Sequence, residues 1–378
     1  MKFIVNSEEL SKNIQGLAKT VNGRSSLAIL DHFLFEVMDD KLDVTASDGE
    51  NMMRVTVNLI ECSMVNDDRE KRFCIHNSMI GDFLKNIPSQ PITFEVDMND
   101  FVVKVSYMNG HIQFPCTAGS EYPVIKLMKD EYQTVSLPSE MMLNDICRTA
   151  PFIGQDTLRP VMNSICFNFT SEGLDVVSTS GSVLMKISHP ELDAKNTGTF
   201  LLPTKPAALL KYFLEKNMEV KVKFTENGAV FECDNWKLTC RLIEGRYPNY
   251  NSVIPMDNSL EIRVDKKCLQ EAIKRMLPMG NQEMKTLKLE IAPDMMTVSC
   301  QDLNYNTSAT ESIPCETIGN TITIGLNGEI LCSVLSHINT DAVRMKMVES
   351  SRPVIILPDE NIEREYLTSL VMPMMITE

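Results

Sequence analysis

The sequence lacks the features that mark export, membrane insertion and a structural metal. No apolar run approaches the about 18 residues of a membrane-spanning helix, and the N-terminal residues 1–9 lack the order of a secretory signal. No Cys-x-x-Cys occurs, and the five histidines show no paired ligand spacing, so we expect neither a zinc site nor any cofactor. These absences favour a cytoplasmic protein with no membrane partner.

Catalytic motifs are absent too. There is no glycine-rich phosphate loop, no Gly-x-Ser-x-Gly and no His-Glu-x-x-His. The strongest enzymatic alternative makes Cys166 or Cys240 a nucleophile and His189 its base, but both cysteines lie in apolar strand patterns that raise a thiol pKa. We therefore predict a non-catalytic protein, and a scaffold that binds proteins but no DNA stays open as a second alternative.

The composition indicates a soluble protein of several domains. A chain of 378 residues exceeds what one hydrophobic core usually serves, so two or three domains are expected. The eleven cysteines are scattered singly and read as buried thiols. A net charge of −15 argues against nucleic-acid binding over the whole surface, but it leaves a local basic face open.

A repeat of about 125 residues organises the chain. The stretch from Cys240 to Pro255 reads as a strand that passes through Tyr-Pro into a linker, and residues 116–126 repeat this pattern. Strand-to-helix openings follow near residues 3, 134 and 260, with Ser7, Ser139 or Pro138, and Asp265 as expected helix starts. Each segment has a second helix midway, near residues 73–87, 200–214 and 322–335.

Alternating apolar and polar runs between these helices predict antiparallel strands with one buried face. The fold class is therefore α+β, with sheets outside and two helices per domain inside, in domains 1–127, 128–254 and 255–378. Three unrelated α+β domains are the alternative.

Motifs along the whole chain resemble a known family, the bacterial sliding clamp or beta subunit of DNA polymerase III. They are Leu27-Ala-Ile-Leu-Asp-His-Phe-Leu-Phe35, Leu158-Arg-Pro-Val-Met-Asn-Ser-Ile-Cys-Phe167, Ile243-Glu-Gly-Arg-Tyr-Pro-Asn-Tyr250 and Leu370-Val-Met-Pro-Met374. The resemblance implies three repeated DNA-clamp domains per protomer and a head-to-tail homodimeric ring around duplex DNA. Such a processivity factor encircles DNA without sequence specificity, is placed by a clamp loader, and tethers the replicative polymerase and repair proteins.

Basic residues on the predicted helices favour a DNA-facing surface in an otherwise acidic protein. The resemblance places DNA contacts at Arg24 and Lys205. The full set of expected DNA contacts is Arg24, Arg148, Lys205, Lys211, Lys267 and Lys274.

The resemblance also implies a hydrophobic groove between the second and third domains that binds a short hydrophobic peptide motif of partner proteins. We call its residues the predicted groove: Met162, Thr179, Ser180, Gly181, Leu184, Pro248, Ser252, Val253, Asn327, Ile330, Pro353, Leu370, Val371, Met372, Pro373 and Met374. Methionines and aliphatic side chains suit such adaptable binding.

This sequence departs from the family pattern at the groove. The loop that usually reads Thr-Asp-Gly-His-Arg-Leu is Thr-Ser-Gly-Ser-Val-Leu at residues 179–184, a usual basic residue is Ser252, and the tail after Met374 is longer. We therefore predict a less basic rim and partner motifs that depend on hydrophobic anchors.

Ring closure requires a heterologous contact between protomers. We expect Ile112 and Phe114 of the first domain to meet Met276 and Leu277 of the third. The alternative is that both residues of the first domain are ordinary core positions.

Overall fold

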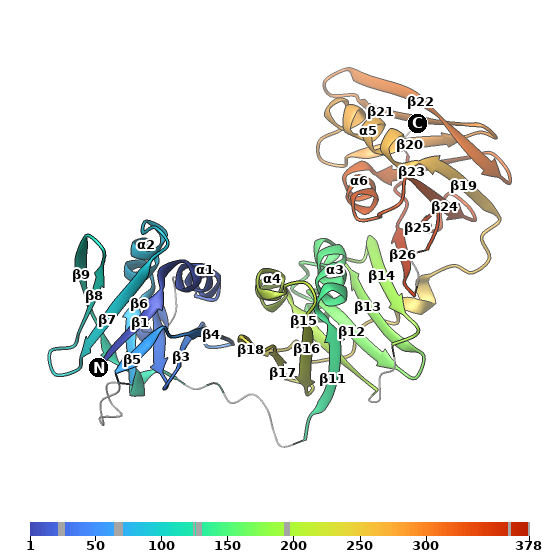
Figure 1. Cartoon of the computed structure of the whole chain (residues 1–378). Helices are drawn as coiled ribbons and strands as arrows, with labels where there is room; N and C mark the ends of the chain where they lie inside the picture. Colours follow the sequence, from blue (N-terminus) through green and yellow to red (C-terminus); the bar gives the residue numbers. More distant parts are fainter. Residues whose placement is uncertain are drawn as a thin grey trace. The chain divides into compact units, whose positions relative to one another are not determined.

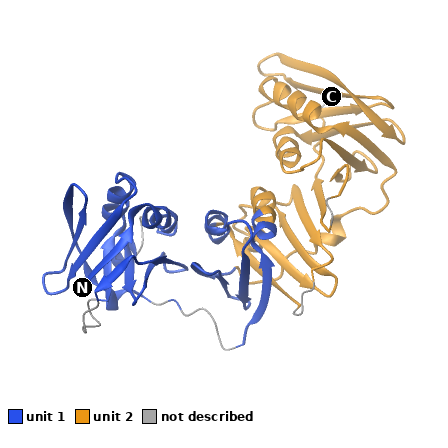
Figure 2. Cartoon of the chain, viewed as in Figure 1, with its two compact units in different colours: residues 1–143, 205–242 blue, residues 144–204, 243–378 orange. Residues whose placement is uncertain are grey.

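The computed structural model describes residues 1–21, 27–63, 71–123, 125, 131–192, 197–361 and 364–376. The chain forms two compact units (Figure 2). Unit 1 contains Met1–Leu143 and Lys205–Leu242, and unit 2 contains Asn144–Thr204 and Ile243–Glu378. The units divide the predicted second domain between them, and its boundaries at 128 and 254 stay a prediction.

The α-helices start at capping side chains. In α1 the cap is Asn6 rather than Ser7: Asn6 Oδ1 accepts hydrogen bonds from the backbone N–H groups of Glu8 and Glu9, while Ser7 Oγ donates to Pro88 O. Asp265 caps α5 as predicted, and Asn327 caps α6. The α-helices within the described part of the chain are α1 (Ser7–Ala18), α2 (Asn77–Lys85), α3 (Ser139–Thr149), α4 (Thr204–Phe213), α5 (Lys266–Met276) and α6 (Gly328–Ser336).

Short 3₁₀ helices occupy several connections. They are η1 (Ala28–Asp31), η2 (Gly119–Glu121), η3 (Ala150–Phe152), η4 (Pro160–Met162), η5 (Tyr250–Val253) and η6 (Leu277–Met279). None of the helices in the described ranges is long and apolar enough to span a membrane.

Unit 1 contains two antiparallel sheets (Figure 1). The smaller sheet has the order β5 (Glu61–Ser63), β1 (Lys2–Asn6), β7 (Pro91–Asp97), β8 (Val102–Tyr107) and β9 (Gly110–Pro115). The larger sheet has the order β10 (Thr117–Ala118), β6 (Arg72–His76), β2 (His32–Val37), β3 (Lys41–Ser47), β4 (Asn51–Asn58), β18 (Trp236–Arg241), β17 (Gly228–Glu232), β16 (Glu219–Phe224) and β11 (Gln133–Pro138). The β4–β18 pairing therefore joins strands of the predicted first and second domains.

Helices α1 and α4 also meet in unit 1. A Cβ added to Gly16 of α1 would lie 2.4 Å from Phe213 Cζ and 2.4 Å from Tyr212 Cε1 on α4. Tyr212 Oη donates to Lys12 O at 3.1 Å, and Lys12 Nζ lies 2.6 Å from Glu215 Oε1. A residue without a side chain is needed where these two helices approach each other.

Unit 2 is built on one antiparallel sheet of 12 strands. Its order is β15 (Gly198–Pro203), β12 (Ser164–Thr170), β13 (Gly173–Thr179), β14 (Val183–His189), β26 (Tyr366–Val371), β25 (Val354–Pro358), β24 (Ala342–Met347), β19 (Leu260–Asp265), β22 (Thr307–Ile318), β21 (Met295–Asp302), β20 (Thr286–Ile291) and β23 (Ile322–Asn327). The last strand of the chain, β26, thus lies between β14 of the predicted second domain and β25 of the third.

A continuous core supports this long sheet. One buried cluster combines Met185 and Ile187 of β14 with Leu269 of α5 and Leu331 of α6. Within the described residues the sheets are antiparallel and the helices few, which confirms the predicted α+β fold class.

Candidate functional site

The turn at residues 179–184 is held by its own polar groups. Thr179 Oγ1 donates to Val183 O at 2.7 Å and accepts a hydrogen bond from Gly181 N at 3.1 Å. Gly181 has φ +93°, a conformation that other residues rarely adopt. The turn therefore presents an exposed glycine backbone between two ends fixed in the sheet.

The C-terminal part of the predicted groove lies directly against this turn. In the β14–β26 ladder, Val183 pairs with Val371 and Leu184 with Leu370, and Met372 N donates to Ser182 O at 2.8 Å. Leu184 and Leu370 are buried in a cluster with Tyr247 and Tyr250. Residues from three distant parts of the sequence thus lie together in the structure.

Several residues of the predicted groove are buried, so they support its surface and do not form it. Met162, Thr179, Leu184, Leu370 and Val371 are buried. The exposed ones are Gly181, Pro248, Ser252, Val253 and Met372, with Val253 50% exposed. A ligand would therefore meet a small apolar surface backed by these buried side chains.

The domain-three members lie along β23, α6 and the tail. Asn327 Oδ1 accepts from Ile330 N at 3.0 Å to cap α6, and the half-buried Ile330 packs against the unit 2 core. Met374 N donates to Gly325 O at 2.8 Å, so the tail follows the edge of β23. Pro373 and Met374 line a cavity of about 430 Å³ there. Pro353 is half-buried and comes directly before β25.

Arg159 is a basic residue near this surface that sequence reasoning missed. A Cβ built on Gly181 would lie 3.8 Å from Arg159 Nη2 and 3.6 Å from Met162 Cε. Arg159 Nε donates to Asp156 Oδ2 at 2.8 Å, and neither terminal amino group has a hydrogen-bond partner among the residues that the structure describes. Arg159 stands in the Leu-Arg-Pro motif at 158–160, which was the available signal. One guanidinium therefore borders the otherwise weakly basic turn.

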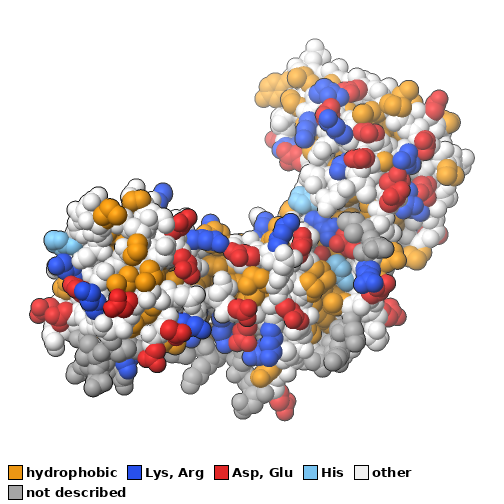
Figure 3. All heavy atoms as spheres, in the orientation of Figure 1, with side chains coloured by type: hydrophobic (Ala, Val, Ile, Leu, Met, Phe, Trp, Pro, Cys, Tyr) orange, Lys and Arg blue, Asp and Glu red, His pale blue; other side chains and the backbone are white. Residues whose placement is uncertain are grey.

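Three of the predicted DNA contacts are exposed on helices. Lys211 lies on α4, and Lys267 and Lys274 lie on α5. Lys267 has a weak contact of 4.0 Å with Glu271, and no other described residue forms an ion pair with Lys211 or Lys274. On the face drawn in Figure 3, basic and acidic side chains are intermixed. Arg24 lies outside the described residues.

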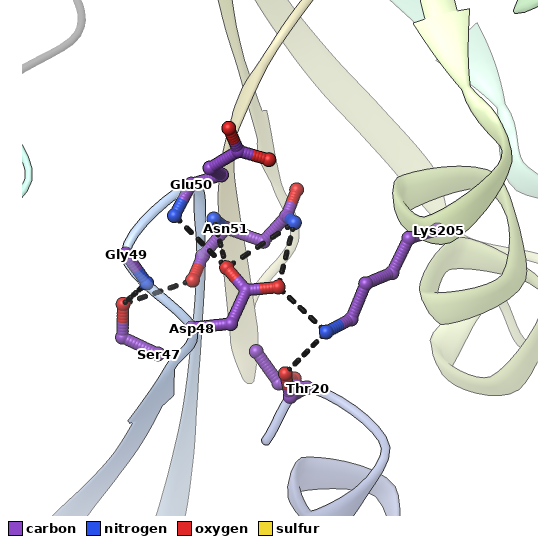
Figure 4. A network of polar contacts seen from close by, with 7 residues as sticks. All are labelled: Thr20, Ser47, Asp48, Gly49, Glu50, Asn51 and Lys205. Atoms are coloured by element: carbon purple, nitrogen blue, oxygen red, sulfur yellow. Dashed lines mark hydrogen bonds and ion pairs between the residues drawn. The ribbon is translucent and has the colours of Figure 1, made fainter. Parts of the chain in front are cut away.

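The ammonium group of Lys205 forms hydrogen bonds to other residues of unit 1 (Figure 4). Its Nζ donates to Asp48 Oδ2 at 2.6 Å and to Thr20 O at 2.7 Å. Burial alone would raise the pKa of Asp48, but hydrogen bonds from Lys205 and Asn51 lower it below the ordinary value. Lys205 therefore ties the start of α4 to the β3–β4 turn and to the end of α1.

The prediction that Arg148 contacts DNA is wrong. Its side chain is 9% exposed, and Nη1 and Nη2 donate to Glu365 Oε1 and Oε2, each at 2.6 Å. Because this guanidinium is buried and already forms a bidentate ion pair with a carboxylate, a phosphate of DNA cannot reach it.

Two of the four predicted subunit contacts are core residues of the protomer. Phe114 is 3% exposed and packs edge-on against Phe83 at 5.8 Å. Met276 is 5% exposed and belongs to the unit 2 core. Their assignment to a subunit surface is wrong, because the protomer already buries them. Ile112 and Leu277 are half-buried and stay predicted contacts.

The cysteine-enzyme alternative finds no support. Burial raises the pKa of Cys166 and of Cys240 to about 12, so neither thiol is ionised near neutral pH. The imidazole of His189 is hydrogen-bonded to Asp145 at 2.8 Å. No cysteine of the chain is in a disulfide.

Comparisons with known proteins agree over the whole chain. Three models match in order: the N-terminal, central and C-terminal domains of the DNA polymerase III beta subunit, over residues 1–126, 136–249 and 251–375. Beta sliding clamps of Synechococcus elongatus and Vibrio cholerae are 22% and 23% identical, with coverage of 99–100% of both chains.

Solved structures show the same fold. The sliding clamp of Pseudomonas aeruginosa bound to griselimycin has a TM-score of 0.92 at 21% identity, with all of both chains covered. The beta subunit from Thermotoga maritima has a TM-score of 0.89 at 21% identity, again over the full length of both.

Proposed function

This chain belongs to the family of the DNA polymerase III beta subunit, the sliding clamps, and we propose from that membership that it is a DNA sliding clamp. It encircles duplex DNA without reading its sequence and tethers polymerase and repair proteins through a hydrophobic peptide site. The observation that carries this proposal is the match of all three beta-subunit domains, in order, to one chain with the clamp fold. This family is a non-catalytic subunit of DNA polymerase III.

We propose that two protomers close the ring through strand edges. Strand β9 ends the smaller sheet of unit 1, so one of its edges has no partner among the strands that the structure describes. Residues 307–314 of β22 pair with β21 alone, because β19 pairs only with residues 315–318. Open edges are templates for pairing with another chain. A head-to-tail contact between β9 and β22 covers both, with Ile112 and Leu277 as the apolar side chains beside them.

DNA is held by dispersed lysines and not by a continuous basic surface. Lys211, Lys267 and Lys274 are exposed at helical positions suited to phosphates, and Arg24 stays in the proposed set. Contacts of this kind carry no sequence information and weaken with salt. That behaviour suits a ring that must stay on DNA by topology while it moves along it.

The peptide site is the exposed part of the predicted groove together with Arg159. Apolar anchors of the partner bind beside Val253 and Met372, and Arg159 offers the only guanidinium that we find near Gly181 among the described residues. Clamp loader, replicative polymerase and repair proteins are the proposed partners, and a cytoplasmic location fits its eleven free cysteines.

Retention on DNA of different topology tests the clamp function. The protein, loaded by a bacterial clamp loader, is expected to stay on nicked circular DNA through a salt wash and to leave when a restriction enzyme linearises the circle. Ile112→Glu is the matched control, because a charge on the edge strand should leave a folded protomer that cannot close. Equal retention on linear and circular DNA overturns the proposal.

A further inference from the structure

Four charged side chains gather inside unit 2, and we call them the buried tetrad: Asp145, Arg148, His189 and Glu365. Besides the two Arg148–Glu365 hydrogen bonds, His189 Nε2 lies 2.8 Å from Asp145 Oδ2, and Arg148 Nη2 lies 3.5 Å from Asp145 Oδ1. Their side chains are between 1% and 16% exposed. Asp145 and Arg148 lie on α3, His189 ends β14, and Glu365 directly precedes β26.

The tetrad has its own cation and is no metal site. Ligand atoms of Asp145, His189 and Glu365 lie within 4.8 Å of one another, a spacing that suits a metal ion. The guanidinium of Arg148, however, already bonds both oxygens of Glu365 and faces Asp145. A divalent ion there would have to displace a bidentate ion pair and then lie beside an unpaired buried guanidinium.

Charge neutrality of the tetrad depends on His189. Two carboxylates and one guanidinium leave one negative charge, which one proton on the Asp145–His189 pair cancels. Burial raises the pKa of Asp145, although the hydrogen bond from His189 and the charge of Arg148 act against this. Burial alone would lower the pKa of His189, but the hydrogen bond and charge of Asp145, with the charge of Glu365, raise it above the usual value. Loss of that proton at higher pH leaves an uncompensated negative charge in the interior.

The tetrad lies at one end of the β14–β26 ladder, and the peptide site lies at the other. The ladder runs from Ser188 paired with Tyr366 to Val183 paired with Val371. At a rise of about 3.4 Å per residue its ends are roughly 17 Å apart. The backbone of β26, paired with β14 over this whole length, connects the two ends.

Hydrophobic burial alone sets the register of β26 poorly. Leu367 and Val371 pack in the main core of unit 2, whereas Leu370 packs in the cluster with Tyr247 and Tyr250. The second side of the strand carries the half-buried Thr368 beside Leu370, so a shift by one residue would still bury one apolar side chain. Polar anchors then help to select the register: Ser369 Oγ donates to Ile356 O at 2.7 Å, and Glu365 is held by two short hydrogen bonds.

We propose that Arg148 and Glu365 are positioning residues for the peptide site: the buried tetrad fixes β26 in register against β14, so that Leu370, Val371 and Met372 stand correctly beside the 179–184 turn. This inference rests on the proposed peptide-tethering function. It assigns Arg148 a part in partner binding in place of the predicted part in DNA binding.

Peptide affinity and strand register test the proposal together. The probe is a fluorescein-labelled short hydrophobic peptide that is selected on the wild-type protein and no longer binds the Val253→Glu variant. Glu365→Gln and Arg148→Lys are expected to weaken its binding by about 5- to 20-fold. Retention on circular DNA should stay within about twofold of wild type, as expected for residues remote from DNA. Arg263→Gln, which removes an exposed ion pair with Asp359, is the matched control.

Register is measured with a cross-strand disulfide. Lys186 and Thr368 are paired directly across the ladder and are half-buried. The Lys186→Cys/Thr368→Cys protein should form this disulfide nearly completely, and adding Glu365→Gln should reduce its yield, as determined by peptide mass mapping. This readout does not depend on DNA or peptide.

The pH dependence of peptide affinity distinguishes a positioning role of the tetrad from a purely structural one. Wild-type affinity should fall as the pH rises through the raised pKa of His189, whereas Glu365→Gln should flatten the profile because its tetrad is neutral with a neutral imidazole. The inference would be overturned if both variants bind the peptide with the affinity and pH profile of wild type, and if adding Glu365→Gln leaves the disulfide yield unchanged. If the wild-type protein is not retained on circular DNA, the clamp function is rejected instead. The disulfide yield then still decides whether the tetrad sets the register of β26.

Discussion

Replacing Lys205 with methionine tests whether this residue ties the joint of unit 1 together. The substitution keeps the aliphatic stem and removes an ammonium that lies 2.6 Å from Asp48 Oδ2, a carboxylate with a 3% exposed side chain. Removing one partner of a buried ion pair costs about 3–5 kcal/mol. Asp48 keeps hydrogen bonds from Glu50 N and from the backbone and side chain of Asn51. We therefore expect a smaller loss of unfolding free energy, about 1.5–3 kcal/mol.

The assay is denaturant unfolding followed by the fluorescence of Trp236. This is the only tryptophan of the chain, and it lies buried on β18, which pairs with β4 across the joint. Lys211→Met, on the exposed side of the same helix, should change stability by less than about 0.5 kcal/mol. A double-mutant cycle with Asp48→Asn should give a coupling energy above about 1 kcal/mol.

The pH dependence has a fixed sign. Since the pKa of Asp48 is lowered by folding, its contribution is complete above the ordinary value near 3.8 and is lost as the pH falls through the lower folded value. The difference between wild type and Lys205→Met should therefore be full at neutral pH and shrink in acid. Equal stability of the Lys205→Met and Lys211→Met proteins, with a coupling energy near zero, would refute this reasoning. Lys205 would then return to the set of plain DNA contacts.

Three further predictions compare matched residues. Gly16→Ala should cost about 1–3 kcal/mol by overpacking against Phe213, whereas Gly81→Ala, whose Cβ would meet nothing closer than 4.0 Å, should be neutral or stabilising in thermal unfolding. Phe114→Ala should cost about 3–5 kcal/mol as a core truncation, whereas Ile112→Glu should leave the protomer folded and appear as a monomer in size-exclusion chromatography. A thiol reagent should modify the exposed Cys268 first and leave Cys166 and Cys240 unmodified until denaturant is added, as measured by mass spectrometry.

Local patterns predicted the elements better than the contacts between them. Asp265 was identified as a cap because a capping residue is recognised from its immediate neighbours. At α1, two adjacent capping residues were available, and Ser7 turned away to bond Pro88, which lies 81 positions later. Such a choice depends on tertiary structure and is invisible in a local sequence window.

The errors at functional residues have the same origin. Arg148 has helical surroundings typical of a solvent-facing basic residue, but Glu365 approaches it from 217 positions away. Lys205 meets Asp48 from 157 positions away. Ile112 and Phe114 were predicted together as subunit contacts, but their local sequence could not show that Phe83 already covers Phe114. Where the resemblance supplied an arrangement, as at the 179–184 turn and Leu370, the residues do lie together.

The position of β26 has a consequence for how the protein is made. Strand β14 is complete by residue 189, but its partner on that side consists of residues 366–371. During synthesis the edge of β14 must therefore stay unpaired while more than 170 further residues leave the ribosome, a number that follows from the bounds of the two strands. At about 5–20 residues per second this interval lasts on the order of 10–35 seconds, during which the edge is open to wrong pairing or to a chaperone.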